Sequence, residues 1–293
     1  MSQSGGGAGV AAVVAAAEQA LGATAHEVTS LGGGSINAAL GLELDDGRSV
    51  FVKHRADASA GAFAVEADDL RWLESAGALR LPEVLAHGTE PPFLALEWIR
   101  SGPPAADHDE RLGRELAALH QAHPETFGRE APNLIGPLHQ DNTPADDWPT
   151  FYTTRRLAPM AREAERSGGL DTATRAGVES VCERIDTLCG PPEPPARLHG
   201  DLWAGNAITD EHGGPVLIDP SAYGGHREID LAMMRLFGGF SERVFGAYAE
   251  VHPLADGHRE RVPLYQLYPL LVHAALFGGA YGRRVVAALD RVG

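Results

Sequence analysis

The chain has 293 residues, 44% of them hydrophobic, and carries a formal net charge of −16 at pH 7. This length allows one large domain or two modest ones. The acidity argues against nucleic acid or an anionic membrane as the main partner, because phosphate-rich surfaces favour clustered Lys and Arg, but it leaves room for a small anionic ligand. No apolar run approaches the ~20 residues that a membrane helix needs.

The N-terminal hundred residues begin with a stretch rich in Gly and Ser. We expect residues 1–9 to be disordered. The Ala-rich stretch up to about Leu21 predicts a helix; it contains Glu18 and has no basic residues before it, so it does not resemble a secretion signal. Residues 27–55 alternate apolar and polar side chains around Asp-Asp-Gly at 45–47, which predicts a β-hairpin.

A helix, a loop and a strand complete this first part of the chain. Residues 63–73 place apolar side chains at helical spacing, and Gly77 marks the end of the predicted helix. Residues 79–88 are predicted to form a loop interrupted by proline, and residues 92–99 another strand. The Ser-Gly-Pro-Pro run at 101–104 is typical of a linker.

Helices dominate the rest of the chain. We predict them over residues 108–122, 159–167, 171–189, 228–252 and 258–288, with short strands at Ala207–Thr209 and Val216–Ile218. The sequence therefore predicts an α+β, bilobal architecture. A small β-rich N-terminal lobe spans residues 1–100, a larger helical C-terminal lobe spans residues 101–293, and a ligand cleft is expected between them.

The chain has two cysteines, Cys182 and Cys189. If both lie on one helix they are two turns apart, roughly 10 Å at ~1.5 Å per residue, which exceeds the reach of a disulfide. Their spacing is not that of a zinc site. We interpret them as reduced thiols of a cytoplasmic protein.

A glycine-rich stretch lies between the first two predicted strands. Gly32, Gly33, Gly34 and Ser35 could approach phosphates closely and point backbone N–H groups at them, although a flexible turn has the same composition. The stretch is not a Walker A loop, because no Gly-Lys-Ser/Thr follows.

Lys53 lies one strand after this glycine-rich stretch. A Lys on an apolar strand is commonly a solvated edge residue. Its place in the order of elements, however, is that of the Lys that pairs with nucleotide phosphates in kinase-type folds. Glu66, in the next predicted helix, is the matching partner that would hold Lys53 in place.

The stretch RLHGDLWAGN, residues 197–206, carries the strongest chemical signal. A phosphoryl acceptor needs a carboxylate that orients its hydroxyl and accepts its proton, and Asp201 on a rigid loop suits this role. Mg²⁺ takes oxygen ligands, which Asn206 and the strand-end Asp219 can provide. An Asx-rich turn feeding a hairpin would also contain these residue types. The Asp, Asn and strand-end Asp in this order match the catalytic loop and metal-binding Asp of kinase-like phosphotransferases.

These motifs and several longer stretches resemble the fructosamine kinase (ketosamine 3-kinase) family, within the aminoglycoside-phosphotransferase-like group of the protein-kinase-like fold. The resemblance covers nearly the full chain, and the long central stretch and the Trp after His-Gly-Asp-Leu separate this family from the wider group. It is carried by residues 32–37 (GGGSIN), 51–53 (FVK), 63–77, 127–160, 198–206 (LHGDLWAGN), 217–240 and 267–282.

The resemblance implies an ATP-dependent kinase that phosphorylates the sugar of a ketosamine, such as a fructosamine or ribulosamine, at the 3-hydroxyl. It implies a small glycated amine as the partner, and ATP and Mg²⁺ as cofactors. By position, Asp201 would be the catalytic base and Asn206 and Asp219 would bind Mg²⁺. Lys53 would hold the ATP phosphates and would itself be held by Glu66.

The resemblance also suggests which residues meet adenine. Glu97, Trp98 and Ile99 would form the hinge that contacts the base through backbone groups.

The acceptor side is less sharply defined. Trp203 can offer a flat apolar face to a sugar ring or an amino-acid aglycone, or it can pack in the core. His273, with the Phe-Gly-Gly-Ala-Tyr-Gly turn near it, is expected to line the same pocket. His226 and Arg227 are expected to touch either the catalytic loop or the substrate, and Asp230 to brace that loop.

Two departures from related patterns matter. Asp-Pro-Ser at 219–221 replaces the Asp-Phe-Gly of protein kinases, so we expect no control by a swinging Phe. Ser35 stands where many family members carry a Cys that can in principle link two subunits. We therefore expect a monomer or a non-covalent dimer whose activity is insensitive to mild oxidants and to reductant.

Two alternative functions stay open at this point. One is a small-molecule kinase of the same fold for aminoglycosides, choline or a similar amino alcohol, since the charge of −16 is compatible with an acidic pocket for a cation. The other is a nucleotide-binding pseudokinase that acts as a regulatory module. The joint presence of Lys53, Asp201, Asn206 and Asp219 argues against that reading.

Overall fold

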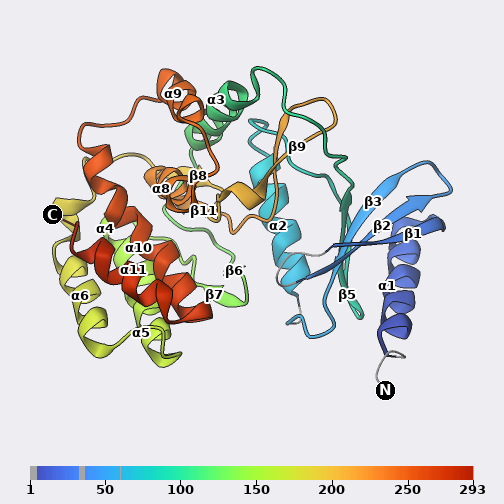
Figure 1. The fold of residues 1–293 in the computed structure, drawn as a ribbon, viewed down its shortest axis with the longest axis horizontal. Coiled ribbons are helices and arrows are strands. Elements are labelled where there is room, and N and C mark those ends of the chain that lie inside the picture. Colours follow the sequence, from blue (N-terminus) through green and yellow to red (C-terminus); the bar gives the residue numbers. More distant parts are fainter. Residues whose placement is uncertain (1–4, 33–36, 60, 293) are drawn as a thin grey trace.

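The computed structural model describes residues 5–32, 37–59 and 61–292. Its N-terminal lobe is built on a five-stranded antiparallel sheet in the order β1-β2-β3-β5-β4 (Figure 1). The strands are β1 (Ala25–Leu31), β2 (Ala38–Leu44), β3 (Ser49–His54), β4 (Val84–Thr89) and β5 (Pro92–Glu97). β2 and β3 form the predicted hairpin, with Ala39 opposite Lys53.

Two helices cover the opposite faces of this sheet. α1 (Gly5–Leu21) packs on one face and α2 (Ala62–Glu74) on the other. Successive strand residues point to opposite faces, and accordingly Phe93 belongs to the cluster beneath α1 whereas Leu94 belongs to the cluster beneath α2. α2 therefore lies between the sheet and the C-terminal lobe (Figure 1).

Two expectations for this lobe are wrong. Residues 5–9 of the stretch expected to be disordered belong to α1, which begins at Gly5, because a helix that has already formed is extended more readily than it is started. Residues 1–4 lie outside the described residues. The predicted loop at 79–88 contains most of β4, which pairs with β5 along the edge of the sheet. That pairing across the sheet is a tertiary contact and leaves a weak local pattern.

The C-terminal lobe is mainly helical. Its helices are α3 (His108–Gln121), α4 (Trp148–Phe151), α5 (Ala158–Arg166), α6 (Thr172–Glu183), α7 (Ile185–Leu188), α8 (Glu228–Phe237), α9 (Glu242–Val251), α10 (His258–Phe277) and α11 (Ala280–Leu289), with a π-helical turn at Tyr152–Leu157 between α4 and α5 and a 3₁₀ turn at Ala204–Asn206. Three short antiparallel pairs join β6 (Asn133–Ile135) to β7 (Leu138–Gln140), β8 (Ala196–Leu198) to β11 (Tyr223–Gly225), and β9 (Ala207–Thr209) to β10 (Pro215–Leu217).

Three long predicted helices are each divided in two. Gly238 and Gly239 separate α8 from α9, and Gly278 and Gly279 separate α10 from α11; all four have positive φ angles. Glycine adopts this left-handed backbone readily and commonly ends helices. Arg184 leaves the helical conformation with φ −113° and separates α6 from α7.

A hydrophobic cluster crosses the boundary between the lobes. It contains Leu70 of α2, Leu202 of the stretch after β8, and Leu217 of β10, each at most 1% exposed. This cluster fixes α2 against the segment that carries the His-Gly-Asp motif, so the candidate site residues of both lobes meet at one place.

Cys182 and Cys189 are free thiols. In the described part of the chain no helix is long and apolar enough to span a membrane.

Candidate active site

An ion-paired lysine marks the N-terminal side of the cleft. Lys53 of β3 points to the sheet face that α2 covers, and its Nζ atom lies 2.7 Å from Glu66 Oε1. The same Nζ atom also pairs with Asp219, which follows β10 in the C-terminal lobe. Burial alone would lower the pKa of Lys53, but the charges of Glu66 and Asp219 outweigh burial and raise the pKa, so the ammonium group stays charged.

Asp219 has an unusual backbone conformation. Its φ angle is 56°, a left-handed value that few residues other than glycine adopt, although Asp tolerates it better than most. The conformation directs a carboxylate that is 42% exposed toward Lys53. Residues held in such conformations are typical of functional sites.

Residues 199–206, the catalytic loop, are held from below by Asp230 of α8. This carboxylate is fully buried and accepts hydrogen bonds from the backbone N–H groups of His199 at 2.7 Å and Gly200 at 2.9 Å. His120 of α3 lies 3.2 Å from it. Burial would raise the pKa of Asp230, but the hydrogen bond and charge of His120 hold it below its ordinary value. Asp230 thus braces the loop as predicted.

His199 ties the catalytic loop to the end of β10. Burial lowers its pKa, so the ring is neutral. Its Nε2 atom lies 3.0 Å from the carbonyl oxygen of Ile218, and its Nδ1 atom accepts a hydrogen bond from Asp201 N at 3.3 Å. Gly200 follows with φ 85°, and a Cβ atom there would overlap the carbonyl oxygen of Ser221.

Asp201 and Asn206 face each other across this loop. Asn206 Nδ2 donates hydrogen bonds to Asp201 O at 2.9 Å and Asp201 Oδ2 at 3.2 Å, and reaches Asp219 O at 3.4 Å. Its amide oxygen is therefore the atom that Asn206 can offer to a metal. Burial and the nearby charge of Asp219 raise the pKa of Asp201 to about 7.

A pocket opens beside Asp201. It is lined by Asp201, His273 and a largely apolar wall that includes Tyr268, Ile229 and Met233. The structure thus brings His273 of α10 to the same pocket as the candidate base. Phe277, the last residue of α10, and Tyr281 of α11 lie around the His273 ring with centroid distances of 5.7 and 4.9 Å.

Trp203 lies within the catalytic loop, on the surface of the protein. Its indole folds over Gly205, where a Cβ atom would overlap the ring, and 42% of the residue is exposed. The indole is therefore not part of the hydrophobic core in this structure.

Glu97 is the last residue of β5, and Trp98 and Ile99 follow it on the way to the C-terminal lobe. The N–H groups of Glu97 and Trp98 already donate to Glu83 O at 2.9 Å and Ser49 O at 3.3 Å. Gly32 directly follows β1 and is exposed. Gly33, Gly34 and Ser35 lie outside the described residues, and so does the expectation based on Ser35.

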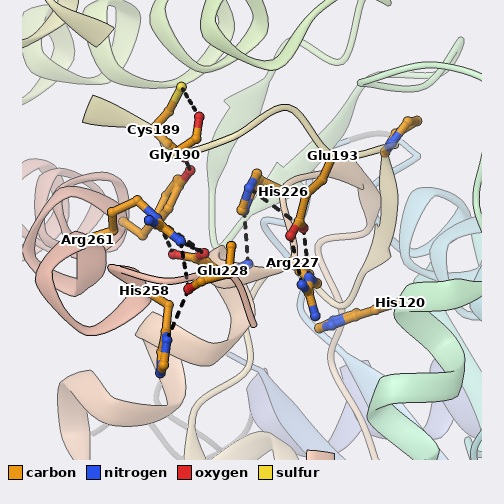
Figure 2. Close-up of polar contacts among 12 residues, drawn as sticks. His120, Cys189, Gly190, Glu193, His226, Arg227, Glu228, His258 and Arg261 are labelled. Carbon is orange, nitrogen blue, oxygen red and sulfur yellow. Dashed lines mark hydrogen bonds and ion pairs between the residues drawn. The ribbon is translucent and has the colours of Figure 1, made fainter. Parts of the chain in front are cut away.

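His226 and Arg227 do not line the pocket, and this part of the site prediction is wrong. Both are 3% exposed. Figure 2 shows Arg227 directed at Glu193, with Nε–Oε2 and Nη2–Oε1 distances of 2.7 Å, and His226 between Glu193 and Glu228. Arg227 also donates to the carbonyl oxygen of His252. A guanidinium with this many donors is satisfied best by converging oxygens, here those of the protein itself.

His199 and Tyr268 also belong to the site, although neither was predicted from the sequence. His199 had a signal, since it belongs to the His-Gly-Asp motif. Tyr268 had none, because its place on the pocket wall depends on how α10 packs against the catalytic loop.

The assembled groups suit phosphoryl transfer. A cation at Lys53 faces oxygen donors at Asn206 and Asp219, which are the hard ligands that Mg²⁺ prefers. Asp201, with a raised pKa, lines the neighbouring pocket, where an acceptor hydroxyl would be close to it. Among the described residues no group of three or more His, Cys, Asp or Glu side chains could hold a metal ion.

The fold defines the class of protein. Choline kinase LicA from Streptococcus pneumoniae superposes with a TM-score of 0.64 over 95% of this chain and 98% of that chain at 17% sequence identity. The chain therefore has the protein-kinase-like, bilobal α+β fold.

Closer matches define the family. The fructosamine kinase family model matches residues 10–292. A structure from Thermobifida fusca YX-ER1, solved as a candidate fructosamine-3-kinase, is 43% identical with a TM-score of 0.89 over 96% of this chain and 98% of that chain. The chloroplastic protein-ribulosamine 3-kinase of Arabidopsis thaliana is 34% identical over 90% of this chain and 82% of its own length. The chain belongs to the fructosamine kinase family and is an ATP-dependent kinase.

Proposed function

We propose that this kinase transfers the γ-phosphoryl group of ATP to a sugar hydroxyl, the 3-hydroxyl, of ketosamines such as fructosamines and ribulosamines. The observation that carries the proposal is the position of Asp201. Its carboxylate borders the pocket and lies beside Asn206 and the Lys53–Asp219 pair. An acceptor in the pocket would thus lie next to the phosphate-binding groups.

Each residue has a role that follows from its chemistry. Asp201 orients the acceptor hydroxyl and takes its proton, and the pKa near 7 allows both protonation states close to neutral pH. Lys53 binds ATP phosphates and is held by Glu66. Asn206 and Asp219 would hold Mg²⁺ together with the phosphates, and the metal would neutralise charge there.

The nucleotide base and the acceptor occupy opposite ends of this arrangement. We assign adenine to the hinge at residues 97–99, chiefly to backbone groups of Ile99, because the N–H groups of Glu97 and Trp98 are already bonded. The glycine-rich stretch at 32–35 would cover the phosphates. Trp203 and His273 would contact the sugar or its amine, since one is exposed on the loop and the other lines the pocket.

A substrate panel tests this function. ATP consumption is measured with fructosyl-lysine, ribulosyl-lysine, kanamycin and choline, and the product is located by phosphorus NMR. We expect turnover with the two ketosamines and phosphorylation at the 3-hydroxyl. Preferential turnover of kanamycin or choline would instead assign an amino-alcohol kinase, and ATP binding without turnover of any acceptor would indicate a pseudokinase.

The metal assignment has its own test. Two protein ligands are too few to hold Mg²⁺ tightly without phosphates. Calorimetry should show weak or no Mg²⁺ binding to the free protein, and activity should require Mg²⁺ or Mn²⁺. Tight binding to the free protein would contradict the assignment.

We also propose a cytoplasmic enzyme that is a monomer or a non-covalent dimer. Both described thiols are poorly reactive, since burial raises the pKa of Cys182 to about 11 and raises that of Cys189. Size-exclusion profiles and activity should be the same after peroxide and after dithiothreitol. A reductant-sensitive dimer on a gel would contradict this, and Ser35→Cys is the variant that would introduce such a bond if the stretch lies at a dimer contact.

A further inference from the structure

A second carboxylate of α2 lies on the same face as Glu66. Asp69 follows it by three residues, a spacing that places two side chains on one side of a helix. Asp69 is 2% exposed. Buried carboxylates are expensive unless other groups satisfy them, so the partners of Asp69 indicate what its position secures.

Those partners belong to the C-terminal lobe. Asp69 Oδ2 accepts hydrogen bonds from Asn133 Nδ2 at 2.8 Å and from the backbone N–H of Ala222 at 3.1 Å. Its Oδ1 atom pairs with Arg129. One side chain of α2 thus contacts the segment before β6, β6 itself and the segment after β10.

The contact with Ala222 completes a two-point attachment. Through Lys53, Glu66 is linked to Asp219, the first residue of the Asp-Pro-Ser-Ala segment. Asp69 binds the last residue of that segment, Ala222. Two residues three apart on α2 therefore hold two residues three apart on the segment that carries a metal-binding carboxylate.

The same carboxylate is connected to the wall of the acceptor pocket. Asn133 Oδ1 accepts hydrogen bonds from Gln140 Nε2 and Asn142 Nδ2, both at 2.9 Å. Tyr268 OH donates to Gln140 Oε1 at 2.6 Å, and Tyr268 lines the pocket beside Asp201. A continuous set of buried hydrogen bonds thus joins α2 to both sides of the site.

We propose that Asp69 is a positioning residue that holds α2 and the 219–222 segment in the arrangement needed to bind ATP. The inference rests on the proposed function only for the identity of the acceptor. In kinases the Lys–Glu pair must be formed for phosphoryl transfer, and the position of its helix controls that pair. Here the Glu66 helix is attached through Asp69 to the segment that the Lys53–Asp219 pair also contacts.

The test compares Asp69→Asn with Asp68→Asn. Asn has the shape of Asp, but one terminal group becomes a donor, so it cannot accept from Arg129, Asn133 and Ala222 together. We expect Asp69→Asn to raise the KM for ATP and lower kcat, each about tenfold or more, and to leave the KM for the ketosamine within about twofold. Asp68 is the matched control, since it also pairs with Arg129 but its side chain is 58% exposed; its variant should behave like the wild type.

Nucleotide affinity gives a readout that needs no ketosamine. Calorimetry with a non-hydrolysable ATP analogue and Mg²⁺ should show weaker binding to Asp69→Asn, even if the wild type phosphorylates none of the tested ketosamines. In that case the substrate assignment fails and the positioning role stands. A folded Asp69→Asn variant with wild-type analogue affinity and kcat would overturn the proposal.

A second variant, Asn133→Ala, tests the proposal if Asp69→Asn does not fold. Asn133→Ala removes one donor to Asp69 and the link toward Tyr268, and leaves Glu66, Lys53 and Asp219 in place. We expect the same direction of change with a smaller size. Unchanged analogue affinity and kcat in folded Asn133→Ala would also contradict the role of this contact.

Discussion

Two clusters of charged residues in this molecule differ in what completes them. At the cleft, Lys53 and Glu66 meet Asp219, whose side chain is 42% exposed. In the C-terminal lobe, Arg227 is bound by Glu193 and Arg261 by Glu228, with Arg227 and Glu228 each 3% exposed (Figure 2). The first cluster keeps a charged group accessible, and the second satisfies its charges internally.

An accessible charged group can bind a ligand, whereas charged groups paired in the interior hold the fold together. A buried ion pair must be well hydrogen-bonded, because removing one partner leaves an uncompensated charge. Arg227 meets this requirement with bonds to Glu193, His252 O and Pro253 O. Its contacts connect the 190–195 loop, which leads into the catalytic loop, to the segment after α9. Substitutions at the cleft should therefore change the kinetic constants, and substitutions in the Arg227 cluster should change the free energy of unfolding.

The largest expected effect is a loss of kcat caused by a substitution at the cleft. Asp201→Asn should lower kcat about 10²–10⁴-fold, the usual contribution of a general base, with ATP affinity nearly unchanged. Steady-state kinetics and calorimetry with an ATP analogue measure the two quantities separately. An undiminished kcat would remove Asp201 from the mechanism.

A substitution in the Arg227 cluster should lower the stability of the protein. Arg227→Met leaves the partly buried Glu193 carboxylate without its main partner and should lower the free energy of unfolding by about 3 kcal/mol. At a temperature where the variant is folded, both KM values should stay close to those of the wild type. Denaturant titration and kinetics test this, and a selective rise in the ketosamine KM without loss of stability would return Arg227 to the substrate site.

Substitution of Trp203, which is also exposed, should have a smaller effect on the kinetics. Trp203→Ala should raise the KM for a ketosamine by up to about tenfold, within the ~0.5–1.5 kcal/mol that an aromatic contact provides, and should leave the KM for ATP unchanged. Because 42% of the residue is exposed, the melting temperature should change little. Equal rises in both KM values with a lower melting temperature would assign the indole to packing.

The smallest effect concerns pH. Burial lowers the pKa of His226 from 6.5 to about 4, despite the opposing charge of Glu193. The neutral ring in the folded protein thus contributes fully above pH 6.5, and this contribution is lost as pH falls, because the unfolded chain takes up the proton first. Between pH 6.5 and 5.5 the loss is about 1 kcal/mol. Denaturant titrations at the two pH values should show a smaller decrease for His226→Gln; an equal decrease would contradict this origin.

The parts of the site that the sequence predicts are those with local signals. The β2–β3 hairpin, the Lys53–Glu66 pair and the catalytic loop depend on residues close in the chain or on a motif with a fixed order of elements. The breaks at Gly238 and Gly278 also had a local signal, the Gly-Gly pairs, which helical periodicity obscured.

Other features depend on distant contacts. β4 is a strand because β5 pairs with it, and His226 and Arg227 are buried because the 190–195 loop folds over them. Asp69 resembles the exposed Asp68 in sequence, and only the packing of α2 on β6 distinguishes the two. Such distinctions are tertiary, and no spacing along the chain contains them.

The backbone conformation of Gly200 also limits which mutations the gene can carry. Its φ of 85° and the carbonyl oxygen of Ser221 exclude a side chain of any size. Every missense change in this codon therefore distorts the backbone between His199 and Asp201, whatever the chemistry of the new residue. In a deep mutational scan under selection for activity, this position should tolerate no substitution, and codon changes there should persist only where the gene is dispensable.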